Sequence, residues 1–375
     1  MQGLLALEDG RLFPGQGWGA AGMATGEIVF NTSMTGYQEV LTDPSYHRQI
    51  VTMTTPHIGN TGVNLEDEEA AQIWVAGFVV RALSPRVSNW RSRGDLNDYL
   101  RKQGKIGLSD VATRALVRHI REQGAMRAAI AHGPAADDPQ ALIHAARTAP
   151  DMSGANLVDE VTTPEAYHWS ERSDPAWYAQ HHTEPGGALI VAYDMGIKRN
   201  ILRMLTDRGL RVTVVPAHTP AEDVLAMTPA GIFLSNGPGD PAAVDYMIDN
   251  VKGLLGQIPI FGICLGHQIL ALALGGQTHK MPFGHRGGNQ PVKNLISQQV
   301  EISVHNHGFA VSADSDLQGA EVTHINLNDN TIEGIRHNAL GAFSVQYHPE
   351  AAPGPHDSLY LFDEFVARVK ANAQD

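Results

Sequence analysis

The stretch Ile258-Pro-Ile-Phe-Gly-Ile-Cys264-Leu-Gly-His-Gln268 runs from an apolar segment straight into a segment with helical character. Cys264 stands at the junction between Gly262 and Gly266, in a G-x-C-x-G pattern. Flanking glycines are typical of a tight strand-to-helix turn, because larger side chains would clash around a strained nucleophile. The dipole of the following helix favours the thiolate. The pattern therefore predicts a nucleophile, although a buried cysteine packed between two glycines is the alternative on this stretch alone.

The same order of strand and helix recurs in the residues before this turn. Apolar runs and helical patterns alternate as follows: 188–193 then 198–208, 211–215 then 221–227, 231–234 then 246–255, and 258–263 then 266–274. Successive strand-then-helix units predict an α/β domain over residues 188–375, with an open, mostly parallel sheet and helices on both faces. In such sheets ligands bind at the carboxyl ends of the strands, which is where Cys264 falls.

The residues before this domain have a different character. Short apolar runs alternate with Gly and Asp turns, and helices are expected over 67–75 and over 109–123, the latter with Ser109 as N-cap and Gly124 after its end. Residues 1–170 therefore predict a mixed α+β domain. The polar stretch 171–187 is rich in Pro and Gly and predicts a linker.

Composition excludes several classes of protein. The chain has 375 residues, a net charge of −13 and one cysteine. The acidity argues against a nucleic-acid partner, and charge, Gly or Pro interrupts every apolar run that could span a membrane. A single thiol forms no intrachain disulfide and fits a reducing cytoplasm. The N-terminal segment has no basic region of the kind that opens a secretory signal, so we expect a cytoplasmic protein.

A second motif, Phe343-Ser-Val-Gln-Tyr-His348-Pro-Glu350, supplies a base for the cysteine. The run before His348 has strand character, and Pro349 keeps His348 out of the helical region. Residues two apart on an extended chain share a face, so His348 and Glu350 can point the same way. This arrangement suits an imidazole base and the carboxylate that orients it, and it predicts a catalytic triad of Cys264, His348 and Glu350.

These two motifs resemble those of the class I glutamine amidotransferases. Other segments resemble the small subunits of carbamoyl-phosphate synthase in particular, and the resemblance covers essentially the whole chain. These segments are residues 7–10, 29–39, 41–45, 56–60, 283–289, 306–311 and 349–357. The chain departs from the family pattern at Ala112, where the family often has aspartate before Thr113 and Arg114.

The resemblance implies a glutaminase subunit that releases ammonia from glutamine through a thioester on Cys264. The family's glutamine-binding positions carry over onto Ser45, Gly237, Gly239, Leu265, Gln268, Asn306, Gly308 and Phe309. The N–H of Leu265 and an N–H of the loop at residues 236–240 would hold the oxyanion. Because Ser45 comes from the first domain, the implied pocket lies between domains.

The resemblance also implies a partner. A large synthetase subunit would receive the ammonia and use bicarbonate and two ATP to make carbamoyl phosphate for arginine and pyrimidine synthesis, in a heterodimer or a tetramer of heterodimers. This chain has no G-x-x-x-x-G-K-[ST] loop for ATP, so no cofactor is expected in it. His305 and His307 have a spacing that a metal could use, but the sequence shows no Cys or carboxylate near them, so no metal site is expected.

Three alternatives remain open from the sequence. The chain could serve another synthase, which leaves residues 1–170 unexplained. It could be a thiol hydrolase that works alone on an ester or peptide, without a partner or a preference for glutamine. A scaffold that only docks onto a synthetase is the third, but a scaffold needs none of Cys264, His348 and Glu350.

Overall fold

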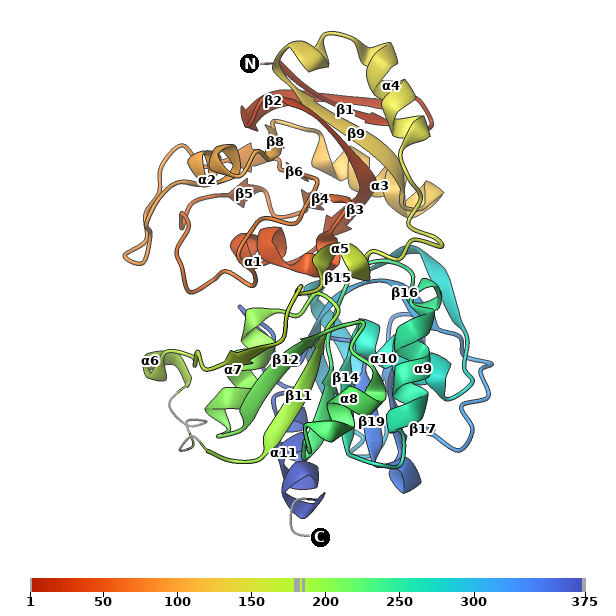
Figure 1. The fold of residues 1–375 in the computed structure, drawn as a ribbon. Coiled ribbons are helices and arrows are strands. Elements are labelled where there is room, and N and C mark those ends of the chain that lie inside the picture. The colour runs from red at the N-terminus through yellow and green to blue at the C-terminus, as the bar shows by residue number, and fades with distance from the viewer. Residues whose placement is uncertain (1, 179–182, 184–185, 373–375) are drawn as a thin grey trace. The chain divides into compact units, whose positions relative to one another are not determined.

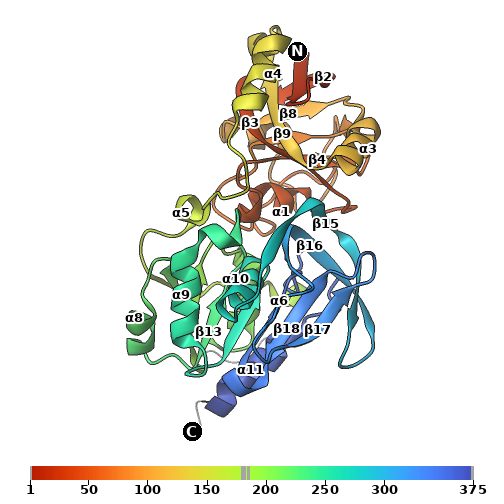
Figure 2. The same cartoon turned by 90° about the vertical axis from the view of Figure 1, so that its right-hand side faces the viewer.

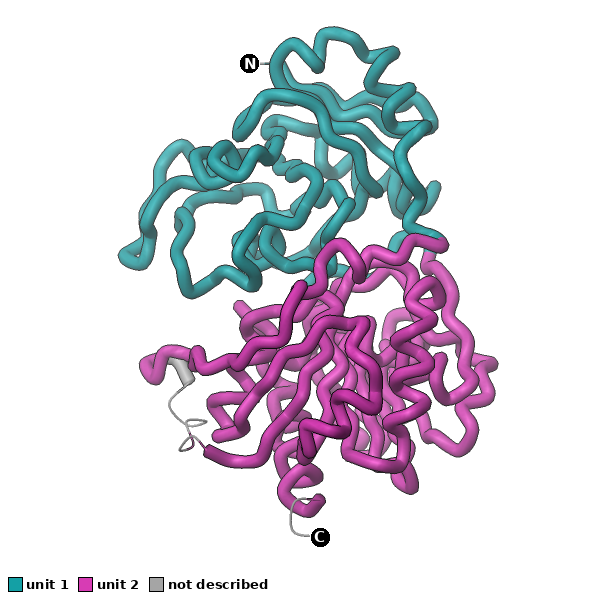
Figure 3. Tube along the Cα trace, viewed as in Figure 1, with its two compact units in different colours: residues 1–153, 282–287 teal, residues 154–281, 288–375 magenta. Residues whose placement is uncertain are grey.

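The computed structural model describes residues 2–178, 183 and 186–372, and the chain forms two compact units (Figures 1 and 3). Unit 1 comprises residues 1–153 and 282–287, and unit 2 comprises residues 154–281 and 288–375. Among the residues that the structure describes, no helix has the length and apolar character needed to cross a membrane.

The division between the units falls earlier in the chain than the predicted domain boundary at residue 170. Residues 154–170 belong to unit 2 because they bond to it. Strand β10 (Tyr167–Trp169) pairs with β12 (Arg211–Pro216), and Thr162 Oγ1 donates to the carbonyl of Asp194 at 2.6 Å. Of the predicted linker 171–187, residues 179–182 and 184–185 lie outside the described residues.

Unit 1 is built on a closed barrel with strand order β1-β2-β8-β6-β4-β3-β9. Alternating residues of these strands, such as Leu5, Ile28 and Ile130, are fully buried in the core of the barrel. The barrel strands are β1 (Gln2–Leu7), β2 (Leu12–Gly19), β3 (Gly22–Asn31), β4 (Gln49–Met53), β6 (Gly77–Val79), β8 (Ile106–Ser109) and β9 (Met126–His132). The small strands β5 (His57–Ile58) and β7 (Ala82–Leu83) pair with each other.

The helices of unit 1 complete the predicted mixed α+β domain. They are α1 (Tyr37–Thr42), α2 (Leu96–Lys102), α3 (Thr113–Gln123) and α4 (Pro139–Thr148), with 3-10 turns at Pro44–Tyr46 and Gly133–Ala136. The prediction of a helix over 67–75 was wrong, because that segment is irregular, with bends and an isolated bridge at Val75. The helix predicted from Ser109 begins only at Thr113, because Ser109 ends β8, but it stops at Gly124 (φ 95°) as expected.

Unit 2 contains a ten-stranded sheet with the order β10-β12-β11-β13-β14-β19-β18-β17-β15-β16. Strands β12, β11, β13, β14 and β19 pair in parallel, which confirms the predicted parallel sheet for this part. Beyond β19 the pairs β19–β18, β18–β17 and β17–β15 are antiparallel, so the sheet as a whole is mixed. The remaining strands are β11 (Leu189–Asp194), β13 (Gly231–Leu234), β14 (Ile260–Ile263), β15 (Thr278–Asn294), β16 (Val300–Val311), β17 (Glu321–Asn326), β18 (Ile332–His337) and β19 (Ala342–Val345).

Helices cover both faces of the parallel part of this sheet. Residues of α8, α9 and α10 share one core with the sheet, and residues of α7 and α11 share the core on the other face. Figure 2 shows α9 and α10 side by side along their face. The bounds are α5 (Val158–Val161), α6 (Pro175–Tyr178), α7 (Arg199–Asp207), α8 (Ala221–Ala226), α9 (Asp245–Leu254), α10 (Leu265–Ala273) and α11 (Tyr360–Asn372), with 3-10 turns at Pro241–Ala243 and Asn338–Leu340. The predicted order of strands and helices over 188–274 is thereby confirmed.

Candidate active site

Cys264 occupies a strained turn between β14 and α10. Its backbone has φ 55° and ψ −103°, a left-handed conformation that a non-glycine residue adopts only when its surroundings hold it there. A Cβ on Gly262 would lie 2.7 Å from the carbonyl oxygen of Gly266, and a Cβ on Gly266 would overlap the carbonyl of Leu234. Both glycines are therefore required by close backbone packing, as the sequence pattern predicted.

The turn places the Cys264 sulfur at the start of a nine-residue helix. The first N–H groups of an α-helix have no partner within the helix and carry its positive end, so the N–H of Leu265 is suited to an oxyanion. The cysteine side chain is 2% exposed. Its thiol donates to the carbonyl of Asn306 on β16 at 3.5 Å.

His348 and Glu350 form the pair that the sequence predicted. Nδ1 of His348 lies 2.7 Å from Oε1 of Glu350, and both side chains are buried. A carboxylate can only accept, so Nδ1 carries the hydrogen and Nε2 presents its lone pair. Nε2 is buried and has no hydrogen-bond partner among the described residues. This nitrogen can therefore accept a proton from an acid in the site.

The Glu350 carboxylate is held in its charged form by Lys198, a residue that the sequence reasoning missed. Burial by itself would raise the pKa of Glu350, but the charges of Lys198 and His348 outweigh it and lower the pKa to about 2. Nζ of Lys198 lies 2.5 Å from the same oxygen that accepts from His348. Asn200 also donates to the backbone carbonyl of Glu350. The signal for Lys198 was present, because it follows the carboxyl end of β11 at the expected ligand-binding edge.

Strand pairing brings the cysteine and the histidine to the same edge of the sheet. Ile263 at the end of β14 pairs with Val345 at the end of β19, and the N–H of Cys264 donates to the carbonyl of Val345 at 2.9 Å. The N–H of His348 donates to the carbonyl of Val304 at 2.8 Å, while the Cys264 thiol bonds two residues further along the same strand. Both groups are thus tied to β16.

Several predicted glutamine-binding residues gather around this edge. Gln268 on α10 donates from Nε2 to the carbonyl of Phe309 at 2.8 Å and to Oε1 of Gln346 at 2.9 Å. Asn306, Gly308 and Phe309 share β16 with the residues that bond Cys264 and His348. These contacts join the helix after the nucleophile to the strand that carries three of the eight predicted glutamine-binding residues.

Gly237 and Gly239 have structural reasons to be glycine. A Cβ on Gly237 would overlap the carbonyl of Met195 and lie 2.8 Å from the side chain of Leu265. Gly239 has φ +94°, and a Cβ there would lie 2.6 Å from the carbonyl of Ala155. Both residues therefore fix the loop after β13 beside the nucleophile turn, and their contact with glutamine stays a prediction.

Ser45 belongs to unit 1, where it lies in a 3-10 turn capped by Asp43. The N–H of Ser45 donates to Oδ1 of Asp43 at 2.9 Å, and the side chain is 6% exposed within the chain. Its expected place in a pocket shared by both domains also stays a prediction.

Two protein families match separate parts of the chain. The family described as "Glutamine amidotransferase class-I" matches residues 190–368, and the one described as "Carbamoyl-phosphate synthase small chain, CPSase domain" matches residues 5–130. The first match confirms the predicted class I glutamine amidotransferase fold for the parallel sheet and its helices.

Curated relatives match over the full length. A carbamoyl phosphate synthase small chain from Syntrophotalea carbinolica is 56% identical over 375 residues, which are 100% of this chain and 99% of the relative. One from Thioalkalivibrio sulfidiphilus is 54% identical over 98% of this chain and 97% of its own. A chloroplastic one from Oryza sativa subsp. japonica is 48% identical over 98% of this chain and 82% of its own.

Proposed function

The chain belongs to the family of carbamoyl phosphate synthase small chains, and on that premise we propose that it hydrolyses L-glutamine with a Cys264–His348–Glu350 triad and supplies the ammonia to a large subunit. The observation that supports this most directly is the His348 ring, which is fixed by Glu350 through Nδ1 and leaves Nε2 as a buried acceptor at the sheet edge that carries Cys264. A scaffold would need neither feature.

In the first half of the reaction His348 takes the thiol proton, and the Cys264 sulfur forms a bond to the carboxamide carbon of glutamine. The carbonyl oxygen becomes an oxyanion held by backbone N–H groups, with Leu265 as one donor and the loop at residues 236–240 as the source of the other. When the oxyanion collapses, the C–N bond breaks and the nitrogen leaves as ammonia with the proton from His348. A γ-glutamyl thioester on Cys264 remains.

In the second half water attacks the thioester while His348 Nε2 accepts its proton. The C–S bond then breaks, glutamate leaves, and the proton returns to the sulfur. The Lys198 charge keeps Glu350 ionised, so that Glu350 can stabilise the imidazolium that forms twice in each cycle. In this proposal glutamine is bound by Gln268, Asn306, Gly308, Phe309, Gly237, Gly239 and Ser45.

The ammonia passes to the large subunit, which uses bicarbonate and two ATP to form carbamoyl phosphate for arginine and pyrimidine synthesis in the cytoplasm. Ammonia released into water at neutral pH would be protonated and lost as a nucleophile, so it has to pass to the large subunit by an enclosed path. The two subunits therefore work together, as a heterodimer or as a tetramer of heterodimers. No cofactor in this chain takes part in the chemistry.

The test is glutamate release from glutamine by the purified chain, with and without a cognate large subunit. We expect weak release by the chain alone, strong stimulation by the large subunit, and loss of turnover in Cys264→Ser. Glu350→Gln should lose most of kcat, and circular dichroism checks that the variant, which also loses the buried ion pair with Lys198, is folded. Esterase activity without glutaminase activity would instead indicate a thiol hydrolase, and stimulation only by a different synthase would reassign the ammonia acceptor.

A further inference from the structure

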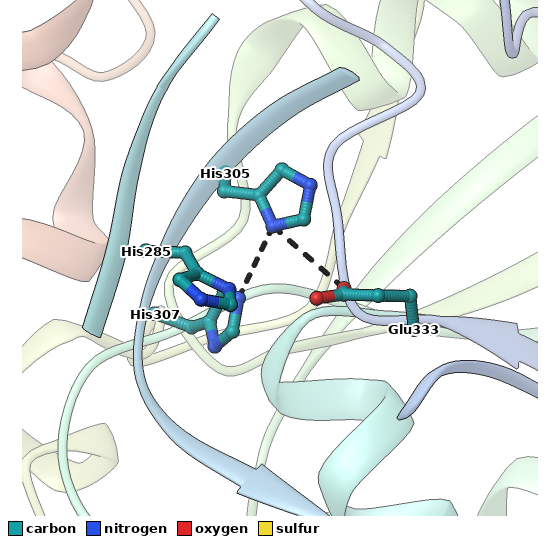
Figure 4. Close-up of side chains that lie close together, drawn as sticks. All are labelled: His285, His305, His307 and Glu333. Carbon is teal, nitrogen blue, oxygen red and sulfur yellow. Dashed lines mark hydrogen bonds and ion pairs between the residues drawn. The ribbon is translucent and has the colours of Figure 1, made fainter. Parts of the chain in front are cut away.

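Two histidines and a carboxylate meet in the interior of unit 2, apart from the proposed triad. His305 and His307 lie on β16 and Glu333 lies on β18, and their exposed fractions are 0%, 4% and 0%. Figure 4 shows the His305 ring with its Nδ1 turned toward both His307 and Glu333. His285, which the same close-up labels, belongs to the 282–287 segment of unit 1.

The separations of the facing atoms match those of metal ligands. Nδ1 of His305 lies 3.2 Å from Nε2 of His307 and 3.7 Å from Oε2 of Glu333. A tetrahedral ion with bonds of about 2.0–2.1 Å to nitrogen and oxygen keeps its ligand atoms about 3.3 Å apart. The two separations therefore lie close to the edge length of such a tetrahedron, and all three atoms are within 4.8 Å of one another.

The opposite sides of both rings are bonded as in metal-binding histidines. Nδ1 of His307 lies 2.8 Å from the carbonyl of Phe309, and Nε2 of His305 lies 2.8 Å from Oγ of Ser303. Because a carbonyl only accepts, His307 carries its hydrogen on Nδ1 and turns the lone pair of Nε2 toward His305. Such outer bonds fix the tautomer and orientation of a ligating imidazole.

The carboxylate of Glu333 adds a negative charge to the two imidazoles. Asn326 donates to Oε1 at 3.4 Å, while Oε2 is the oxygen that faces His305. A carboxylate oxygen beside two imidazole nitrogens is a ligand set that attracts a divalent ion.

We propose that His305 Nδ1, His307 Nε2 and Glu333 Oε2 bind a divalent transition-metal ion with the preferences of Zn²⁺. Imidazole and carboxylate suit zinc, and the ion would be completed by one further nitrogen or oxygen ligand. The ion joins strands that β15 and β17 separate in the sheet order. It therefore acts as a clamp on β16, the strand whose Asn306 carbonyl accepts from the Cys264 thiol.

The test must separate this cluster from the Cys264 thiol, which could itself bind zinc. The full chain and Cys264→Ser are freed of metal by dialysis against a chelator, and Zn²⁺ affinity is measured by competition with a chromophoric chelator. We expect one Zn²⁺ per chain in both proteins. X-ray absorption should then show nitrogen or oxygen neighbours at about 2.0–2.1 Å and no sulfur at about 2.3 Å.

Variants locate the ion among the side chains. In the Cys264→Ser background, His305→Gln and Glu333→Gln should each weaken Zn²⁺ binding by at least about tenfold. Tenfold is the lower end of the loss seen when a residue that only bonds a metal ligand is changed, so loss of a ligand itself should cost no less. His279→Gln, an exposed histidine on β15, is the matched control and should bind as its parent does.

Three results would overturn the proposal: no stoichiometric zinc in the folded full chain, loss of the zinc in Cys264→Ser, or unchanged affinity in both ligand variants. Circular dichroism checks that the variants fold. If they do not fold, the neighbours seen by X-ray absorption in the Cys264→Ser protein decide, because a sulfur-free shell containing imidazole is required.

Discussion

The buried ion pair between Lys198 and Glu350 leads to a quantitative prediction for Lys198→Met. The methionine side chain has nearly the length of lysine, so the change removes the charge while keeping most of the packing. Nζ lies 2.5 Å from the carboxylate, and both residues are nearly inaccessible to solvent. The variant therefore leaves a buried carboxylate that keeps its hydrogen bond from His348 but loses the lysine charge.

The expected cost follows from the pKa of Glu350, which falls from 4.5 to about 2. With each pKa unit worth about 1.4 kcal/mol, this depression corresponds to about 3 kcal/mol of stability at pH 7. Removal of one partner from a buried ion pair costs about 3–5 kcal/mol in other proteins, which agrees. We expect Lys198→Met to lose about 3 kcal/mol.

The pH dependence has a definite sign. Because the pKa is lower in the folded chain than in the unfolded one, the stabilisation is complete above pH 4.5 and is lost as the pH falls toward 2. The stability gap between the parent and Lys198→Met should therefore be wide at pH 7 and should narrow below pH 4.5. Urea unfolding at a series of pH values measures both quantities.

Lys252→Met is the matched control. Lys252 pairs with Asp249 at 3.0 Å on the exposed surface of α9, where losing an ion pair changes stability by about 0.5 kcal/mol or less. The double variant Lys198→Met/Glu350→Gln should lose less than the sum of its single changes, because both charges leave together. Equal losses in the two lysine variants, or a gap that stays constant down to pH 3.5, would refute this account of the pair.

Three further predictions concern stability. Gly266→Ala should lower the free energy of unfolding by about 1–3 kcal/mol, because its Cβ would press on the Leu234 carbonyl. Gly94→Ala, whose Cβ would meet only an ordinary contact at 3.7 Å, should change stability little. Equal urea midpoints for the two variants would contradict the reasoning. Ala112→Asp should stabilise the chain by about 1 kcal/mol, because Ala112 is the N-cap of α3 and makes no side-chain cap bond, and Ala112→Asn should behave similarly if capping rather than charge is the cause. Burial, followed by the charge on His324, lowers the pKa of His267 to about 3, so the folded chain should lose about 1.4 kcal/mol of stability for each pH unit below 6.5. His267→Gln should remove this loss between pH 6.5 and 4, as measured by urea unfolding, whereas His279→Gln should leave it intact.

The predictable part of the fold is the part with local signals. Strands β11 to β14 are short apolar runs, and each is followed by helical spacing, so their bounds could be predicted within about two residues. The antiparallel strands β15 to β18 carry polar residues such as His305 and Glu333 in their interior-facing positions, and no simple apolar pattern marks them. The false helix at 67–75 had helical composition, but its residues serve in turns: Asn64 accepts from the N–H of Asp67 at 2.9 Å.

The candidate site was predictable where one motif carried it. The turn around Cys264 and the His348–Glu350 pair lie within short stretches, so spacing alone gave their local geometry. The position of Lys198 after β11 indicated this edge of the sheet, but its pairing with Glu350 could not be predicted. The same holds for Glu333 and His305, because each pair joins segments distant in sequence. For the same reason the sequence did not indicate that Glu333 lies beside His305, and no metal site was predicted.

The pairing of β14 with β19 also sets an order of assembly for the site. Ile263 meets Val345 only after more than eighty further residues have been added, and His348 follows those. On a ribosome the thiol is therefore made before His348, its proposed base, and stays without it until β19 docks. A chain cut short before β19 lacks the base of the proposed triad, and we expect it to release no ammonia from glutamine.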